Sequence, residues 1–213
     1  MGVADLTWFD ILRRNGRERP GAPALHLDGA TLTHGDLLAR AELLAGGLAA
    51  AGVEAGDRIA LLAQNRAEFM DAVAAAARLG AILVPVNWRL SPEEMRAIVA
   101  DADPAAVIAE AEYAAALDPA AFGAVRGWFA LDAAAAPFRP YGDLLAGSPV
   151  PDRAVAAADP LLMIHTAAVD GVARGAVLSH GNLLAHNLQL AAAWSLGPAD
   201  VALCGLPLFR SWR

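Results

Sequence analysis

Short apolar runs alternate with amphipathic segments in the first half of the chain, and this alternation restricts the folds that the chain can adopt. Three of the apolar runs have the length of buried strands, at 57–63, 81–87 and 105–110. Helices are predicted before and between them, at about 34–50, 66–79 and 91–101. Strands joined through helices form right-handed crossovers, so their sheet is mainly parallel and carries helices on both faces. The expected fold class is therefore α/β.

Turn and capping residues set the boundaries of these elements. Thr33 can cap the helix that follows it, and Ser91 with Glu94 three residues later forms a capping box. Asp28-Gly29 is a two-residue turn signal, which predicts a hairpin over 24–33. These residues favour sharp element boundaries in the first half of the chain.

Signals in the remaining segments are thinner. They predict a short helix at 8–14, a strand at 127–131 and a short helix at 141–147. The Ala-rich stretch "DAAAAPFRP" has the composition of a linker, and a sub-boundary is predicted near 133–160. Strands follow at 161–166 and 175–180, and a helix is predicted from about His180 to Trp194, with Ser179 as its cap.

Composition excludes several classes of protein. Hydrophobic residues make up 57% of the chain, but much of this fraction is alanine, and the longest uncharged stretch, 175–199, contains polar side chains, so no membrane span is predicted. The net charge is −7, and no basic run occurs, which argues against nucleic-acid binding. All sixteen basic residues are arginines. Charged residues interrupt the first fifteen positions, so we expect no signal peptide and a cytoplasmic location.

Two further features of the sequence concern possible reactive or binding side chains. The single cysteine, Cys204, lies in the apolar run "VALCGLPLF" and is expected to be a buried structural thiol. Asn65, Asn87 and Trp88 follow predicted strands, at the carboxyl ends where α/β sheets bind ligands. Loop or capping roles remain the alternative for these three residues.

The stretch "HTAAVDGVARGAVLSHGN", residues 165–182, has the order strand, glycine-bearing loop, strand and helix. Its loop could hold phosphate through the Thr166 hydroxyl, turns at Gly171 and Gly175, and the Arg174 cation. Asp170 repels phosphate unless a metal lies between them, which makes it a candidate Mg²⁺ ligand. From these residues alone, a plain hairpin turned by Asp170-Gly171 stays open as the alternative.

This stretch resembles the phosphate-binding signature of the AMP-forming acyl-CoA synthetases, or adenylate-forming ligases, which is similar to Y-T-S-G-T-T-G-x-P-K-G followed by a strand and Ser-His-x-Asn. The matching residues are Thr166, Gly171, Gly175, Ser179, His180 and Asn182. Residues 167–170, Ala-Ala-Val-Asp, stand where the family has Ser, Gly, Thr and Thr, and Arg174 stands in place of its lysine. The stretches "ATLTHGDLL" and "LGAILVPVNWRLSPEE" also resemble the family. "LPLF" at 206–209 resembles its acyl-pocket motif, which implies Phe209 and Arg210 as substrate-pocket residues.

The resemblance implies that residues 1–213 are the N-terminal portion of the large domain of an adenylate-forming ligase. Its cofactors would be ATP, Mg²⁺ and CoA, and its substrate a small carboxylic acid, in the first place a fatty acid. The ATP-binding residues would be Thr166, Asp170, Gly171, Arg174 and Gly175. No catalytic nucleophile is implied, because in the family the substrate carboxylate attacks the α-phosphate. The family's adenine, ribose and catalytic-lysine sites lie in later segments, so we expect this chain alone not to be a competent ligase.

Two other hypotheses stay open. The chain could be a truncated remnant or interaction module that keeps the fold without the chemistry, and it would then self-associate or bind a completing chain to cover apolar surface. It could also be a free-standing nucleotide-binding domain, although it contains neither GxGxxG nor GxxxxGK[ST].

Overall fold

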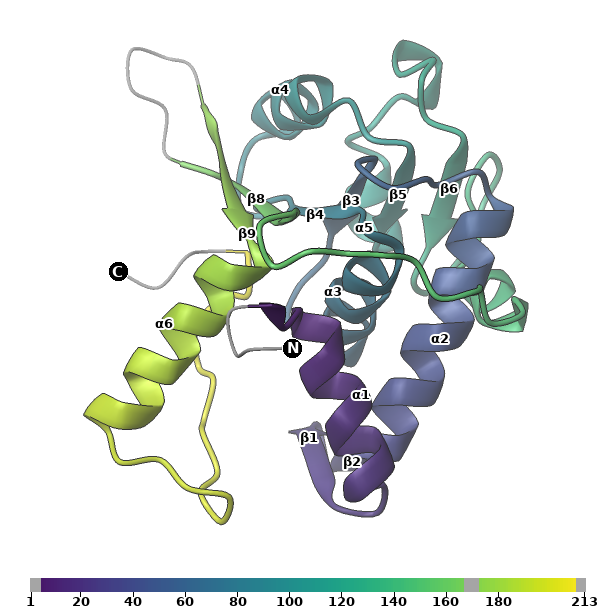
Figure 1. Cartoon of the computed structure of the whole chain (residues 1–213). Coiled ribbons are helices and arrows are strands. Elements are labelled where there is room, and N and C mark those ends of the chain that lie inside the picture. Colours follow the sequence, from purple (N-terminus) through teal and green to yellow (C-terminus); the bar gives the residue numbers. More distant parts are fainter. Residues whose placement is uncertain (1–4, 167–172, 210–213) are drawn as a thin grey trace.

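The computed structural model describes residues 5–166 and 173–209. Its main sheet has seven strands in the order β7-β6-β5-β3-β4-β8-β9 (Figure 1). These strands are β3 (Arg58–Leu62), β4 (Ile82–Pro85), β5 (Ala106–Ala109), β6 (Gly127–Ala130), β7 (Arg139–Pro140), β8 (Pro160–His165) and β9 (Gly175–Ser179). All neighbouring strands pair in parallel except β8 and β9, which pair antiparallel. The α/β fold class with a mainly parallel sheet is confirmed.

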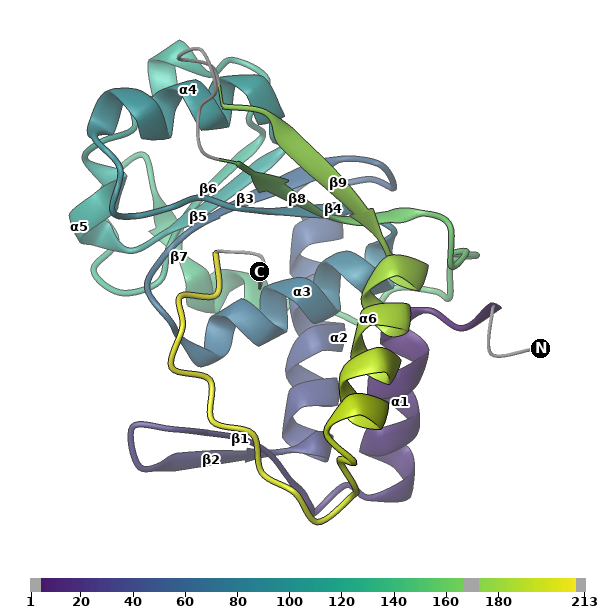
Figure 2. The ribbon, with the colours of Figure 1, turned by 90° about the vertical axis from the view of Figure 1, so that its left-hand side faces the viewer.

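Helices cover both faces of this sheet, as the crossover pattern predicts. The helices are α1 (Trp8–Glu18), α2 (His34–Ala50), α3 (Ala67–Leu79), α4 (Pro92–Ala102), α5 (Ala111–Ala114) and α6 (His180–Ala193), with 3-10 turns η2 (Pro119–Ala121) and η3 (Tyr141–Ala146). Figure 2 shows α4 on one side of the strands and α1, α2 and α3 on the other. No helix within the described residues is long and apolar enough to cross a membrane.

Side-chain alternation along the central strands divides the core into two clusters. In β3, Ile59 and Leu61 pack with the side of α1, α2 and α3, whereas Ala60 and Leu62 pack with α4. Successive strand residues point to opposite faces, so a strand that is buried on both sides is apolar throughout. This explains why the three runs found in the sequence are continuous rather than alternating.

Capping residues begin four of the helices. Thr7, Thr33, Ser91 and Ser179 each accept a hydrogen bond from the backbone three residues later, and the side chain at that later position bonds back to the cap. Such reciprocal boxes satisfy two amide groups that the first turn leaves free. The predicted caps Thr33, Ser91 and Ser179 are therefore confirmed.

A separate two-stranded sheet precedes α2. It consists of β1 (Pro23–Leu27) and β2 (Ala30–Thr33), joined by Asp28 and Gly29 with φ of 50° and 79°. Both residues adopt the left-handed region that such a two-residue turn requires. The hairpin that Asp28-Gly29 predicts is confirmed.

The structure corrects several expectations. Helix α1 extends to Glu18 rather than Arg14, with an ion pair of 3.7 Å between these two side chains, and the predicted helix at 141–147 is the 3-10 turn η3. Strand β7 was not predicted, because its two residues are too few to form a pattern. Cys204 is exposed rather than buried, since the segment around it forms neither helix nor strand.

Candidate functional site

The predicted phosphate loop is framed by the antiparallel strands β8 and β9, in which His165 pairs with Gly175. Just beyond this pair, the Thr166 amide donates to the Arg174 carbonyl at 3.0 Å, and the Thr166 hydroxyl lies 3.4 Å from the same oxygen. Both residues are exposed. The fold thus brings Thr166, Arg174 and Gly175 together at the base of the loop, whereas Asp170 and Gly171 lie outside the described residues.

Arg174 carries the charge that a phosphate group requires, and its side chain is exposed. The Thr166 amide and hydroxyl, by contrast, already face the Arg174 carbonyl. The 5–166 and 173–209 stretches contain no group of three His, Cys, Asp or Glu side chains that could hold a metal ion. The predicted Mg²⁺ ligand, Asp170, falls between them, so its role stays a prediction.

His165, the last residue of β8, connects the hairpin to α4. Its side chain is 2% exposed, and Nε2 lies 2.9 Å from Oδ2 of Asp101 on α4. Ala173, at the other side of the loop base, packs against the same hydrophobic cluster as α4. His165 is thus a strand residue whose buried side chain contacts α4. Its partner Asp101 is 64 residues away and carries no local sequence signal.

His180, at the start of α6, has a structural rather than a catalytic position. Its side chain is fully buried, and Nδ1 accepts a hydrogen bond of 3.1 Å from the backbone amide of Trp8. Burial lowers the pKa of His180 below its ordinary value, against the opposing effect of the Asp159 and Asp10 carboxylates. The imidazole therefore joins the beginnings of α6 and α1.

The predicted substrate-pocket residue Phe209 is buried and packs edge-on against Trp88, with ring centroids 6.4 Å apart. Trp88 in turn stacks on Tyr113 at 5.9 Å. The carboxamide of Asn65 donates to the Leu206 carbonyl and accepts from the Leu208 amide, both at 2.9 Å. Asn65 and Trp88 therefore meet the 206–209 segment at the ends of β3 and β4, while Arg210 lies outside the described residues.

A polar network near the ends of β3 and β5 was not predicted from the sequence. Arg66 pairs with Glu110 at 3.0 Å and with Glu68 at 3.3 Å, and the backbone amide of Gln64 donates to Glu110 at 3.3 Å. Because two carboxylates already neutralise Arg66, its guanidinium is poorly suited to bind a further anion. The network is better explained as support for this edge of the sheet.

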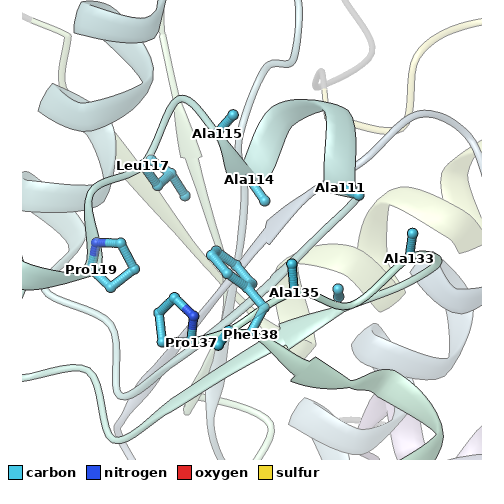
Figure 3. Close-up of a pocket in the computed structure, with 11 residues that line it drawn as sticks. Ala111, Ala114, Ala115, Leu117, Pro119, Ala133, Ala135, Pro137 and Phe138 are labelled. Atoms are coloured by element: carbon cyan, nitrogen blue, oxygen red, sulfur yellow. The ribbon is translucent and has the colours of Figure 1, made fainter.

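An apolar hollow of about 290 Å³ lies elsewhere, next to β6, between the segments 111–119 and 130–138 (Figure 3). Alanine, proline, leucine and phenylalanine side chains line it, Phe138 among them, and none of the predicted site residues takes part. Specific small-molecule sites need a few polar groups to orient the ligand. This hollow therefore supports no assignment.

A match to a family model shows which family the chain belongs to. The model described as "AMP-binding enzyme" covers residues 12–212. The chain belongs to the AMP-binding enzyme family. Among its relatives in this family, indoleacetate–CoA ligase of Aromatoleum aromaticum is 35% identical over 209 residues, and feruloyl-CoA synthase of an Amycolatopsis species is 32% identical over 199 residues.

A solved structure agrees with these relatives. A protein of Rhodopseudomonas palustris described as a long-chain-fatty-acid CoA ligase superposes with a TM-score of 0.92 at 41% identity, over 98% of this chain and 53% of that protein. The two curated relatives are matched over 95% and 93% of this chain, but the chain spans only 40% and 38% of their own lengths. This member of the AMP-binding enzyme family thus corresponds to the N-terminal part of larger ligases.

Proposed function

We propose that this chain supplies the phosphate loop and part of the acyl site of a ligase that activates a carboxylic acid with ATP and passes the acyl group to CoA. The observation that carries the proposal is the β8–β9 hairpin, which holds Thr166 and Arg174 together at the base of the loop that resembles the family's phosphate signature. Membership of the AMP-binding family and the ligase names of its relatives support the reaction class.

In the proposed reaction a carboxylate oxygen of the acid attacks the α-phosphorus of ATP, and the bond from that phosphorus to the bridging oxygen breaks as pyrophosphate leaves. The thiol of CoA then attacks the acyl carbon and AMP departs. Residues of this chain act on the first step by holding charge and geometry rather than by forming a bond. Arg174 would neutralise phosphate oxygens and Thr166 would donate a hydrogen bond, while Asp170 would hold Mg²⁺, which would supply further positive charge to the phosphates.

The acid is proposed to carry an apolar body. Phe209 and Trp88 lie in contact beside the segment that resembles the acyl-pocket motif, and aromatic side chains favour apolar ligands. A fatty acid is the first candidate, and the names of the feruloyl and indoleacetate relatives extend the class to aryl acids. A panel containing both classes is therefore needed in any assay.

ATP binding tests the role of Arg174. Wild type should bind ATP weakly and in a magnesium-dependent way, because Ala167, Ala168 and Val169 replace Ser, Gly and Thr of the family's loop. Arg174→Ala should weaken binding by about ten- to a hundredfold, since it removes a charge-assisted contact of about 1.5–3 kcal/mol. Titration calorimetry with and without Mg²⁺ measures this, and Arg153→Ala, another exposed arginine, is the matched control. Equal ATP affinity of wild type and Arg174→Ala would show that Arg174 is not part of a phosphate site.

Asp170→Thr separates two roles of the acidic side chain in the same assay. Binding should tighten if Asp170 only repels phosphate, because the change removes a like charge worth about 1 kcal/mol at about 4 Å in water and restores a hydroxyl. Weaker binding that appears only with Mg²⁺ would instead identify Asp170 as a metal ligand.

A second candidate function is a non-catalytic interaction module. Its specific support is the loss of polar side chains at 167–169, together with large apolar side chains exposed around α6, such as Trp194 and Leu203. Absence of any measurable ATP binding by the folded chain would favour this function over the ligase role.

A further inference from the structure

The chain after α6 has little regular structure until it returns to the sheet at residues 206–209. Val201 and Leu203 are 94% and 95% exposed, and no helix or strand is formed between 195 and 209. Yet Phe209 is only 6% exposed and Leu208 packs against the larger core cluster. A specific contact must therefore hold the end of an otherwise loosely packed segment.

The Asn65 carboxamide provides this contact. Its NH₂ donates to the carbonyl of Leu206 and its oxygen accepts from the amide of Leu208, so one side chain bonds the backbone on both sides of Pro207. Pro207 has no amide hydrogen to contribute. A carboxamide is the only neutral side-chain group that carries a donor and an acceptor side by side in this way, and it can therefore replace the strand partner that this backbone lacks.

The position of Asn65 is itself fixed. It stands between β3 and α3, next to Arg66, the N-cap residue of α3 that pairs with Glu110. Asn65 is thus held by elements of the central sheet, whereas the residues it bonds lie more than 140 positions later. The contact therefore fixes the position of the 206–209 segment relative to β3.

We propose that Asn65 is the positioning residue of the 206–209 segment and thereby sets Phe209 against Trp88. The proposed function enters only in the use of this segment as part of an acyl site. Asn65 touches no reacting atom in this account; it acts by fixing the backbone that leads to Phe209.

Backbone exchange and a spin label test the proposal on the chain as it stands, without nucleotide or acid. Amide exchange at Leu208, followed by ¹⁵N NMR, should speed up roughly fivefold in Asn65→Ala, as expected for the loss of one net hydrogen bond. A nitroxide on Cys204, the single cysteine, should become more mobile in the same variant. Asn187→Ala, an exposed asparagine on α6, is the control and should change neither signal.

Asn65→Asp separates the two bonds. Its carboxylate can still accept from Leu208 but cannot donate to Leu206, so the Leu208 amide should stay protected while the label gains mobility. This rescue by the conservative variant would not follow from a general loss of stability, which urea unfolding of each variant measures. Unchanged Leu208 exchange in folded Asn65→Ala overturns the proposal. If that variant does not fold, unchanged label mobility in Asn65→Asp does so. Because no ligand is added, failure here leaves the proposed ligase function untouched, and failure of ATP binding leaves this inference untouched.

Discussion

At the scale of single residues, His180 shows how a motif residue can be structural. Its Nδ1 must be unprotonated to accept from the Trp8 amide, and its Nε2 is buried with no partner among the described residues. In a charged imidazole the added proton on Nδ1 would face the Trp8 N–H donor, so the bond would be lost and a charge would be buried. The histidine of the Ser-His-Gly-Asn stretch is therefore suited to hold α1 and α6 together in its neutral form.

We expect this histidine to make stability depend on pH. Because burial lowers the folded-state pKa of His180 below the ordinary value of 6.5, the unfolded chain binds more protons in this range. Its contribution to the free energy of unfolding is full above about pH 6.5 and is lost as the pH falls through the lowered pKa. Urea unfolding at about pH 7.5 and about pH 5.5 measures the difference.

The comparison with His180→Gln isolates this effect. Glutamine can still accept from the Trp8 amide but does not titrate, so the variant should lose part of the pH dependence. His34, whose pKa burial also lowers, is present in both proteins and cancels. Identical pH dependence in wild type and variant would show that His180 contributes none of it.

At the scale of elements, α2 and η3 approach each other closely. A side chain added at Gly47 would overlap the backbone carbonyl of Leu144, and one added at Gly46 would overlap that of Ser148. Adjacent glycines in the middle of a helix cost helix propensity, so they indicate a need for close approach. Here they allow η3 to lie directly against α2.

Gly47→Ala should therefore destabilise the fold by about 1–3 kcal/mol, as overpacking does, although alanine alone would favour the helix by about 0.5–1 kcal/mol. Gly142→Ala is the matched control, because nothing lies within 4 Å of the added methyl group there. Urea unfolding midpoints compare the two. Equal stability of Gly47→Ala and wild type would mean that η3 can move away without cost.

The elements themselves were largely predictable, because caps, turns and apolar runs are local. Thr33, Ser91 and Asp28-Gly29 act within four residues of where they stand. The contacts that build the site were not predictable. His165 meets Asp101 and Asn65 meets Leu208 across 64 and 143 positions, and a single sequence carries no signal for such pairs. Cys204 was misjudged for the same reason, since an apolar neighbourhood in sequence does not ensure burial.

At the scale of the whole molecule, exposed apolar side chains occur on β9, on α6 and in the segment that follows. They are Val177, Leu188, Trp194, Leu196, Val201, Leu203 and Leu206, each at least 43% exposed. Strand β9 is also the edge of the sheet. Exposed apolar side chains beside an open strand edge favour association with another polypeptide.

The isolated chain is therefore expected to self-associate. Static light scattering at protein concentrations of tens of micromolar detects self-association with a binding free energy of about 6–7 kcal/mol. Trp194→Ser with Leu203→Ser should shift the distribution toward monomer, whereas Arg153→Ser, at an exposed position between η3 and β8, should not. A monodisperse wild-type monomer over this range would contradict the expectation.

The isolated chain is also expected to form no acyl-adenylate, because it spans only about two fifths of the curated ligases that it matches. Pyrophosphate release with ATP, Mg²⁺ and a panel of fatty and aromatic acids measures this. Acid-dependent release above a heat-inactivated control would show that the chain is competent on its own.

The β8–β9 hairpin is attached to the rest of the sheet through one register pair, Leu83 with Leu162, whereas β3 shares four such pairs with each neighbour. In mechanical terms, the hairpin can tilt as one unit about the Leu83–Leu162 pair. Thr166 lies four residues beyond Leu162, about 13 Å along the strand, so a tilt of about 10° displaces it by about 2 Å. The contact between Asp101 and His165 is 2.9 Å long and close to Thr166, and it holds the hairpin at its observed tilt. Because His165 lies only one residue nearer to Leu162 than Thr166 does, a shift of α4 would be passed on to the base of the predicted phosphate loop at nearly its own size.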